Sequence, residues 1–317
     1  MWHAMEIILF VVNLSKWLGS QLEAKIWIFL RKEIGMKKYG LVFLFVLSVA
    51  SGADAEEYNS ITNFGYSDLD FSEGDRDELF AETTYYFSAK SSLGPLREFE
   101  FINKSSSLSA AYFHSTTGFY NSDDFALGGE YFSKTGFVIG GNLTTFGRDN
   151  FNTFSLGYLF TPNFLMKFYN TEGTTYAKMR YNYQLNGSDY VGFDVSTDIV
   201  FDWQIFSSKY FSKVGDDKYM SLEFNYLNDN EWDDYWRAAA NYYFTKNSSL
   251  GIDYDENSDY RVGFSHFFNQ NVAIEASYGT ILENPFKYKS FGSDIFKTIW
   301  NTDRNLDKIE LGVTVQF

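Results

Sequence analysis

Apolar and polar side chains alternate along much of this chain, and the carboxy-terminal segment shows the pattern most clearly. In residues 309–317 every second side chain is apolar, and the final residue, Phe317, is aromatic. Residues 174–184 and 188–198 separate into two faces in a similar way. An alternation of period two is typical of a β-strand with one apolar and one polar face. These segments therefore predict strands, and residues 56–317 show no long stretch of helical period.

A short unit recurs along residues 56–317 and predicts the topology. In it, an aromatic residue precedes a short polar turn and a new strand, as in residues 131–134 (YFSK). An aromatic girdle at one membrane interface produces such a repeat, because the chain returns there after every second strand. Since Phe317 is the last instance, we assign these turns to the periplasm and the more acidic turns to the outside. Counting back from the end predicts sixteen strands, at residues 60–68, 78–88, 106–117, 124–132, 136–146, 150–160, 164–170, 174–184, 188–198, 200–211, 218–228, 234–245, 248–254, 258–268, 271–281 and 306–317.

The predicted fold is all-β: a transmembrane, up-and-down, antiparallel β-barrel of about sixteen strands with both termini in the periplasm. The prediction is weakest near residues 197–198, where no Gly or Pro marks a turn between two strands. Because residues 56–317 are few for sixteen strands, a barrel of fourteen strands is the main alternative.

The charged face of each predicted strand must point into the barrel. A Lys or Arg that faces lipid at the midplane costs roughly 2–4 kcal/mol, whereas a wide barrel can enclose an aqueous channel. The predicted pore-lining residues are Glu82, Glu130, Lys167, Lys178, Arg180, Asp194, Asp198, Asp202, Glu223, Arg237, Asp253, Arg261, Glu275, Lys308 and Glu310. Acids outnumber bases among them, which favours a weak preference for cations. For any single residue, the alternative is a salt bridge that only keeps the barrel rigid.

Composition fits a membrane barrel and argues against several other classes of protein. Aromatic residues make up 21% of the chain, while the apolar total is an ordinary 45%. Barrels have this profile because the two faces of each strand cancel and aromatic residues collect at both interfaces. The absence of Cys excludes disulfides and thiolate metal sites. The net charge of −15, without a basic cluster, argues against binding to nucleic acid, because phosphate contacts require Lys and Arg.

The amino-terminal part predicts a secretory signal peptide at residues 36–55. Two lysines precede an apolar stretch too short to span a bilayer, and Ala53 and Ala55 form an A-x-A cleavage site. We therefore expect residues 56–317 to form the mature barrel. Because a signal peptide should begin at the initiator Met, we interpret residues 1–35 as an over-extended start or a non-native leader. A genuine membrane-anchoring extension is the alternative.

Residues 93–108, LGPLREFEFINKSSSL, resemble a segment of a family of proteobacterial outer-membrane β-barrels named "putative porins". In that family the segment reads roughly G-P-L-x-E-x-x-F-L-x-[KR]-x-S, after a strand that ends in an aromatic pair. The matching positions here are Gly94, Pro95, Leu96, Glu98, Phe101 and Lys104. The resemblance implies a barrel fold and an outer-membrane location. Residues 89–105 are too long for a plain turn, so we expect them to fold against or into the periplasmic mouth; a flap with solvated charges is the alternative.

Residues suited to catalysis or to metal binding are few, so we predict no enzyme, no cofactor and no metal site. The predicted mature chain has two histidines, His114 and His266, and a barrel enzyme needs a base beside Ser or Asp. His114 adjoins Ser115, but neighbouring strand residues point to opposite faces. The acids within residues 229–234 lack the ligand spacing and turn Gly of a calcium loop.

The leading functional hypothesis is an outer-membrane porin with a water-filled channel for passive diffusion of ions and small hydrophilic solutes. The alternative is a structural or adhesive outer-membrane barrel whose lumen is closed by residues 282–305. Expected partners are outer-membrane lipid, lipopolysaccharide and the barrel-assembly machinery, because Phe317 resembles the strand end that this machinery recognises. A homotrimer is expected only by analogy with other sixteen-stranded porins.

Overall fold

The computed structural model describes residues 57–69, 76–117, 120–146, 149–230, 234–280 and 307–317. The predicted leader, the signal peptide with Ala53 and Ala55, and residues 282–305 lie outside these ranges. Within the described ranges, no helix is long and apolar enough to cross a membrane.

Sixteen strands make up most of the described chain, which confirms the predicted fold over the alternative of fourteen strands. They are β1 (Glu57–Leu69), β2 (Arg76–Ser91), β3 (Ser107–Thr117), β4 (Tyr120–Phe132), β5 (Phe137–Phe146), β6 (Asp149–Thr161), β7 (Phe164–Thr171), β8 (Thr174–Gln184), β9 (Tyr190–Asp198), β10 (Trp203–Gly215), β11 (Lys218–Asp229), β12 (Tyr235–Thr245), β13 (Ser248–Asp255), β14 (Tyr260–Phe267), β15 (Val272–Thr280) and β16 (Asp307–Gln316). Each predicted strand overlaps one observed strand, and the bounds differ by a few residues.

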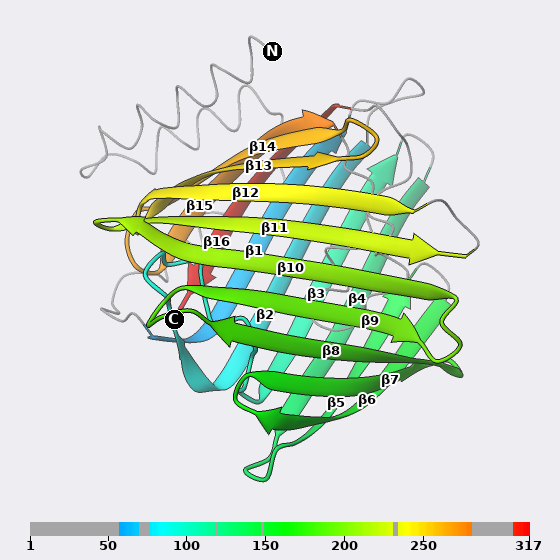
Figure 1. Ribbon diagram of the computed structural model, residues 1–317. Helices are drawn as coiled ribbons and strands as arrows, with labels where there is room; N and C mark the ends of the chain where they lie inside the picture. The colour runs from blue at the N-terminus through cyan, green and yellow to red at the C-terminus, as the bar shows by residue number, and fades with distance from the viewer. Residues whose placement is uncertain (1–56, 70–75, 118–119, 147–148, 231–233, 281–306) are drawn as a thin grey trace.

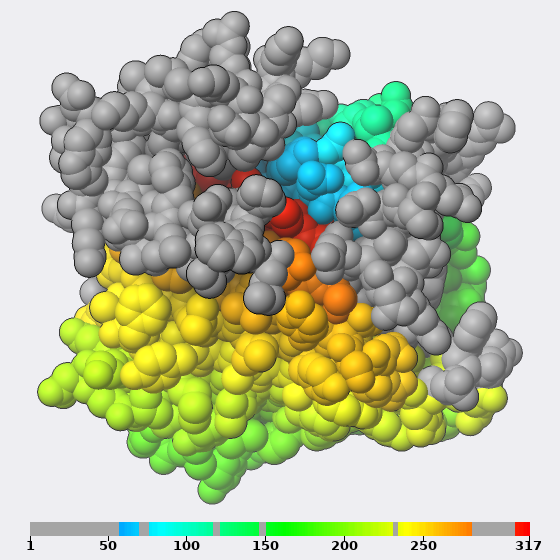
Figure 2. All heavy atoms as spheres, turned by 90° about the horizontal axis from the view of Figure 1, so that it is seen from above, coloured from blue at the N-terminus to red at the C-terminus, as the bar shows by residue number. Residues whose placement is uncertain are grey.

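The strands form one closed antiparallel barrel in which each strand pairs with its neighbours in sequence (Figure 1). The barrel closes between its first and last strands, where Phe64 of β1 pairs with Val313 of β16. Figure 2 shows the red carboxy-terminal strand between the orange of β15 and the blue of β1. The Phe317 carbonyl oxygen accepts hydrogen bonds from the backbone N–H groups of Asn59 (2.5 Å) and Ser60 (2.8 Å). Closure pairs the two strands that would otherwise be open sheet edges in lipid.

The two faces of the barrel wall have opposite polarity. Large apolar side chains on one face are exposed, among them Leu127, Leu143, Leu156, Phe168, Leu222, Leu250 and Ile252. The alternate positions on the same strands carry polar and charged groups that contact residues on distant strands. Because apolar side chains are compatible with acyl chains and charged ones are not, the exposed apolar face is the outer surface.

Aromatic side chains surround the outer surface near the turns that we assign to the periplasm. Exposed members of this girdle are Phe87, Tyr131, Phe137, Phe160, Tyr183 and Phe244. Rings on neighbouring strands touch: the centroids of Phe160 and Phe164 lie 5.4 Å apart, and those of Phe137 and Tyr158 lie 5.1 Å apart. Amphipathic and apolar rings of this kind favour the boundary between hydrocarbon and water, which accounts for the repeat in the sequence.

The turn between β9 and β10, where Gly and Pro are absent, is made by residues 199–202. Phe201 adopts a positive φ of 62°, which a residue of this size rarely does. The Asp198 carboxylate accepts a hydrogen bond from the backbone N–H of Trp203 (3.2 Å). The Thr197 hydroxyl donates to the Trp203 carbonyl oxygen (2.9 Å). Side-chain hydrogen bonds therefore hold this turn where the sequence carries no common turn residue.

Candidate functional site

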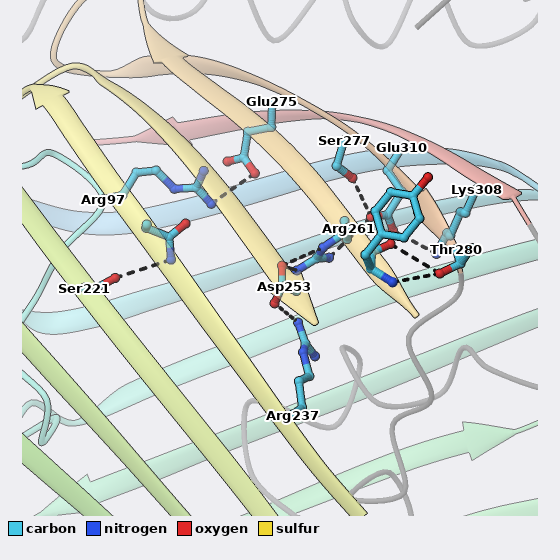
Figure 3. Close-up of polar contacts among 12 residues, drawn as sticks. Arg97, Ser221, Arg237, Asp253, Arg261, Glu275, Ser277, Thr280, Lys308 and Glu310 are labelled. Atoms are coloured by element: carbon cyan, nitrogen blue, oxygen red, sulfur yellow. Dashed lines mark hydrogen bonds and ion pairs between the residues drawn. The ribbon is translucent and has the colours of Figure 1, made fainter. Parts of the chain in front are cut away.

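The lumen is the candidate site, and a series of alternating charges covers part of its wall (Figure 3). Asp253 of β13 is opposite Arg261 of β14 in the strand pairing, and the two form an ion pair of 3.0 Å. Asp253 also accepts a hydrogen bond from Arg237 of β12. Arg261 lies 3.4 Å from Glu310 of β16, which lies 2.8 Å from Lys308. These contacts join four strands on the inner face.

The series continues across the closure of the barrel. Glu78 of β2 lies 3.7 Å from Lys308 and 3.1 Å from Arg76. The Ser277 hydroxyl donates a further hydrogen bond to Glu310 (2.8 Å). We call this series the charge chain; in order, it consists of Arg237, Asp253, Arg261, Glu310, Lys308, Glu78 and Arg76. Each charge has an opposite charge beside it, which offsets part of the cost of removing it from bulk water.

A second charged group lies on the wall formed by β7, β8 and β9. Arg180 donates two hydrogen bonds to Asp194, from Nε (2.7 Å) and from Nη2 (2.6 Å). The two residues are opposite each other in the pairing of β8 with β9. Lys178 Nζ lies 3.7 Å from the same carboxylate. The bidentate geometry holds the guanidinium of Arg180 in one orientation.

Lys167 of β7 donates a hydrogen bond to Glu130 of β4, although β5 and β6 lie between them. Glycines at the intervening inner positions leave room for these side chains. A Cβ atom on Gly140 would lie 2.9 Å from Glu130 Cγ, and a Cβ atom on Gly157 would lie 2.4 Å from Lys167 Cγ. The ion pair therefore passes over β5 and β6, where the glycines present no side chain to the lumen.

Residues 92–106, between β2 and β3, fold into the lumen at the periplasmic end, and we call them the inner segment. This placement agrees with the expectation that they enter the mouth. Within the inner segment, Glu98 is almost fully buried. It accepts hydrogen bonds from Lys209 Nζ of β10 (2.8 Å) and from the Tyr243 hydroxyl of β12. Lys209 also forms an ion pair of 3.1 Å with Glu223 of β11.

The inner segment also contacts the side of the barrel where the chain ends. Arg97 donates from Nη2 to Glu275 of β15 (3.1 Å), and Gln316 of β16 donates to the Leu96 carbonyl oxygen (3.2 Å). A guanidinium is not deprotonated in proteins. The guanidinium therefore stays charged.

Apolar inner residues bind the inner segment by packing. Leu96 packs against Phe267 and Ala273. Ile102 packs against Val138 and Leu165. Leu93 and Phe101 pack against a cluster that consists of Tyr190, Phe211, Tyr219 and Tyr243. The inner face is therefore apolar where protein covers it, and this mixture could not be inferred from the polar alternation alone.

The structure directs most of the predicted lining residues to the inner face. The charge chain contains five of them: Arg237, Asp253, Arg261, Lys308 and Glu310. The groups on β4 and β7–β9 contain five more: Glu130, Lys167, Lys178, Arg180 and Asp194. Inner positions are also taken by Glu82, Glu223 and Glu275. Asp198 ends β9 in the same phase as Asp194, and there it is buried and caps the β9–β10 turn. Asp202 lies elsewhere, because it is exposed in that turn and belongs to no strand.

Lys209 is an inner residue that the sequence prediction missed. A predicted strand over residues 200–211 with Asp202 inward assigns every odd position, Lys209 included, to the lipid face. Strand β10 begins at Trp203 and directs its odd positions inward. A charge in the middle of a strand must avoid lipid, so Lys209 itself was a usable signal of the correct phase. Glu78 was also missed, although it shares a face with Glu82 in the predicted strand 78–88, and Arg76 was missed because β2 begins two residues before that strand.

Neither histidine is arranged for catalysis. Ser115 faces the lumen, where a guanidinium of β2 donates to it, whereas His114 lies 2.9 Å from Asp123 on the outer face. His266 lies 2.8 Å from the Ser248 hydroxyl on the outer face, between two phenylalanine rings. Among the described residues, no group of three His, Asp or Glu could hold a metal ion. Part of the acidic stretch considered for calcium lies outside them.

Comparison with known proteins places this lumen in context. A family model described as "Putative general bacterial porin" matches residues 36–297. No curated protein matches the chain. Among solved structures, the chain is similar to the outer membrane protein Omp33 of Acinetobacter baumannii, with 17% identity and a TM-score of 0.50 over 82% of this chain and 99% of that chain. It is also similar to a triple mutant of the Rhodopseudomonas blastica porin (10% identity, TM-score 0.46, 82% and 99% covered) and to OprD of Pseudomonas aeruginosa (9%, 0.41, 84% and 95%).

The likeness to Omp33 supports the barrel fold, and the family match supports more, because it covers most of the chain. Porins are channel proteins of the bacterial outer membrane and not enzymes, in agreement with the predicted location and with the prediction of no enzyme. By its sequence, this chain belongs to the family of putative general bacterial porins.

Proposed function

We propose that the protein is an outer-membrane porin whose lumen forms a water-filled channel for passive diffusion of ions and small hydrophilic solutes. The observation that carries this proposal is the exposure of charged side chains inside the wall. Arg261 and Glu310 point into the barrel, yet 39% and 29% of their side-chain surfaces remain accessible to solvent. Unhydrated charges cost several kcal/mol each even when they are paired, so an interior lined by them favours water.

The proposed lining consists of the charge chain, the charged groups on β4 and β7–β9, and Glu82, Lys209, Glu223 and Glu275. Both signs of charge are interspersed over this surface, so its field acts on ions of either sign. This lining holds eight acids and eight bases, so the number of charges alone does not support the weak preference for cations that the sequence favoured. The sign of the reversal potential in a salt gradient tests this preference.

Planar-bilayer recording of the purified, refolded protein tests the channel itself. We expect stepwise increases in conductance that scale with salt concentration, because water-filled pores conduct in proportion to their ion content. Swelling of proteoliposomes in sugars of increasing size gives the upper limit for solutes. Heat-modifiable migration in detergent gels shows that the refolded protein is folded. A folded protein that gives no conductance steps would contradict the proposal.

A structural or adhesive barrel with a closed lumen is the second candidate. It is favoured by the inner segment, which contacts β10 and β12 through Glu98 and β15 through Arg97. A variant in which a short Gly/Ser linker replaces residues 92–106 distinguishes the two functions. If the variant conducts ions and the native protein does not, the result supports the closed barrel. If both proteins conduct ions, the result supports the porin.

Assembly partners are also part of the proposal. Residues 36–55 act as a cleaved signal peptide, residues 56–317 form the barrel in outer-membrane lipid and lipopolysaccharide, and Phe317 presents the last strand to the barrel-assembly machinery. Support comes from the A-x-A motif and from the place of Phe317 beside β1 at the closure. Amino-terminal sequencing should find Glu56 first. Native mass spectrometry tests whether three chains associate, as in other porins of this strand number.

A further inference from the structure

Charged side chains inside the barrel differ in their access to solvent. The accessible fractions are 39% for Arg261 of β14, 36% for Glu223 of β11, and 29% each for Glu310 of β16 and Glu275 of β15. They are 13% for Lys167 of β7, 14% for Asp194 of β9 and 15% for Lys308 of β16. Solvent therefore reaches charges on several strands, and Glu275 of β15 is one of them.

The inner segment directs one accessible charge toward β15. Arg97 is 39% accessible and lies 3.1 Å from Glu275 of β15 (Figure 3). Its contact with the described residues uses a single N–H group, Nη2. A guanidinium carries five N–H donors in a planar fork, so most donors of Arg97 make no hydrogen bond to the described residues.

The next residue of the inner segment is in the opposite situation. Glu98 is 5% exposed and is enclosed by Lys209 and Tyr243 on the β10–β12 side. Leu96, on the other side of Arg97 in sequence, is buried against Phe267. The inner segment is thus packed against the wall at its neighbours, and Arg97 is the charged side chain of residues 96–98 that solvent reaches readily.

We propose that Arg97 sets the ion selectivity of the channel at its periplasmic end, as a binding group for anions that pass beside Glu275 of β15. This inference rests on the proposed channel function. The free N–H donors of Arg97 can hold a small inorganic anion, or the carboxylate of a solute through two parallel hydrogen bonds. Glu275 supplies the opposite charge on the facing wall, so the pair favours passage of anions and cations side by side.

Reversal potentials in a KCl gradient test this role. In Arg97→Gln, Glu275 loses its counter-charge. The permeability to cations should rise and that to anions should fall by up to about fivefold each, so their ratio should rise by up to about 25-fold, as expected for one charge about 4 Å from an ion in water. Glu275→Gln should shift the ratio in the opposite direction. Arg97→Lys keeps the charge and should stay near the native ratio. An unchanged ratio in Arg97→Gln would overturn the inference.

Lys104 provides a matched control within the same segment. Its side chain is 35% accessible and pairs with Glu100. Lys104 lies three residues before β3 begins, and the nearby Ile102 packs against Val138 of β5 and Leu165 of β7. Lys104→Gln removes the same charge and should leave the reversal potential unchanged. Equal shifts in Lys104→Gln and Arg97→Gln would mean that total charge, not position, decides selectivity, and would overturn the inference. A folded native protein without conductance would instead overturn the channel function on which the inference rests.

Discussion

The inner segment should detach from the wall when its buried carboxylate is removed. Glu98 accepts hydrogen bonds from Lys209 Nζ at 2.8 and 3.2 Å and from the Tyr243 hydroxyl. In Glu98→Ala the ammonium group of Lys209 keeps its ion pair with Glu223 (3.1 Å) and loses its ion pair with residue 98 (2.8 Å in the native protein). The Tyr243 hydroxyl loses its carboxylate acceptor.

The size of the effect follows from these contacts. Removing one member of a buried charge pair costs about 3–5 kcal/mol, and the hydrogen bond of a hydroxyl to a charged acceptor contributes about 1.5–3 kcal/mol of that. Because Lys209 is 22% accessible and retains Glu223, the cost here should be smaller. We expect the docked state of the inner segment to lose about 2–3 kcal/mol. The equilibrium for detachment then rises about 30- to 150-fold.

Limited trypsin cleavage measures this equilibrium, because Arg97 and Lys104 are trypsin sites within the inner segment. When detachment is fast compared with cleavage, the rate of cutting follows the population of the detached state. In Glu98→Ala, we expect cleavage within residues 92–106 to become about 30- to 150-fold faster, while the strands remain resistant to trypsin. Mass spectrometry of the fragments identifies the cut.

Glu100→Ala is the control for this experiment. It removes a carboxylate two residues away whose side chain is 55% exposed and which pairs only with Lys104 among the ion pairs of the described residues. Exposed pairs of this kind contribute little, so cleavage should change by less than about threefold. A rate in Glu98→Ala that equals the rate in Glu100→Ala would refute the conclusion that Glu98 holds the inner segment in place.

Three further predictions concern packing, acid stability and assembly. In Gly157→Val the new Cβ lies 2.4 Å from Lys167 Cγ and 2.6 Å from a backbone oxygen, so overpacking should cost roughly 1–3 kcal/mol and lower the temperature of the heat-induced shift in detergent gels. Burial raises the pKa of Asp189, in the β8–β9 turn, but hydrogen bonds from the Lys213 backbone N–H and nearby side chains lower it more, so the pKa lies below its ordinary value of 3.8. A depressed pKa gives stability that is present above the unfolded pKa and is lost as the pH falls through the folded pKa; urea unfolding should therefore show an acid-dependent loss below about pH 4 that Asp189→Asn lacks. Deletion of Phe317 removes the carbonyl oxygen that binds the N–H groups of β1, so insertion into vesicles that contain assembly machinery should slow, as measured by the fraction of heat-modifiable protein over time.

The position and number of strands could be predicted because the signal is local. Residues 174–184 alternate clearly, and β8 has the same bounds. Aromatic residues before polar turns marked the periplasmic ends, since the membrane imposes the same boundary on each hairpin. The exact position of the β9–β10 turn could not be predicted in this way. Side-chain bonds of Thr197 and Asp198 stabilise it without Gly or Pro, so the phase of the following strand was assigned wrongly and Lys209 was missed.

The pairing of charges could not be predicted in the same way. Asp253 and Arg261 lie across a short hairpin, so their contact follows from the turn between them. Glu130 and Lys167 meet over two strands only because Gly140 and Gly157 leave the inner surface free. A list of inward charges contains no information on curvature, which decides which of them approach one another.

Sequence alone determined that this chain is a sixteen-stranded barrel with ionisable side chains on the inside, because a period of two and a bilayer of fixed thickness act on each strand separately. Tertiary structure decided which inward charges pair and where the inner segment packs. Closure between β1 and β16 places Glu275 opposite Arg97, 178 positions away in the chain, and the inner segment buries Leu96 against Phe267 of β14. These outcomes depend on the sum of all strand pairings, since the ends of a barrel meet only when every register between them is set.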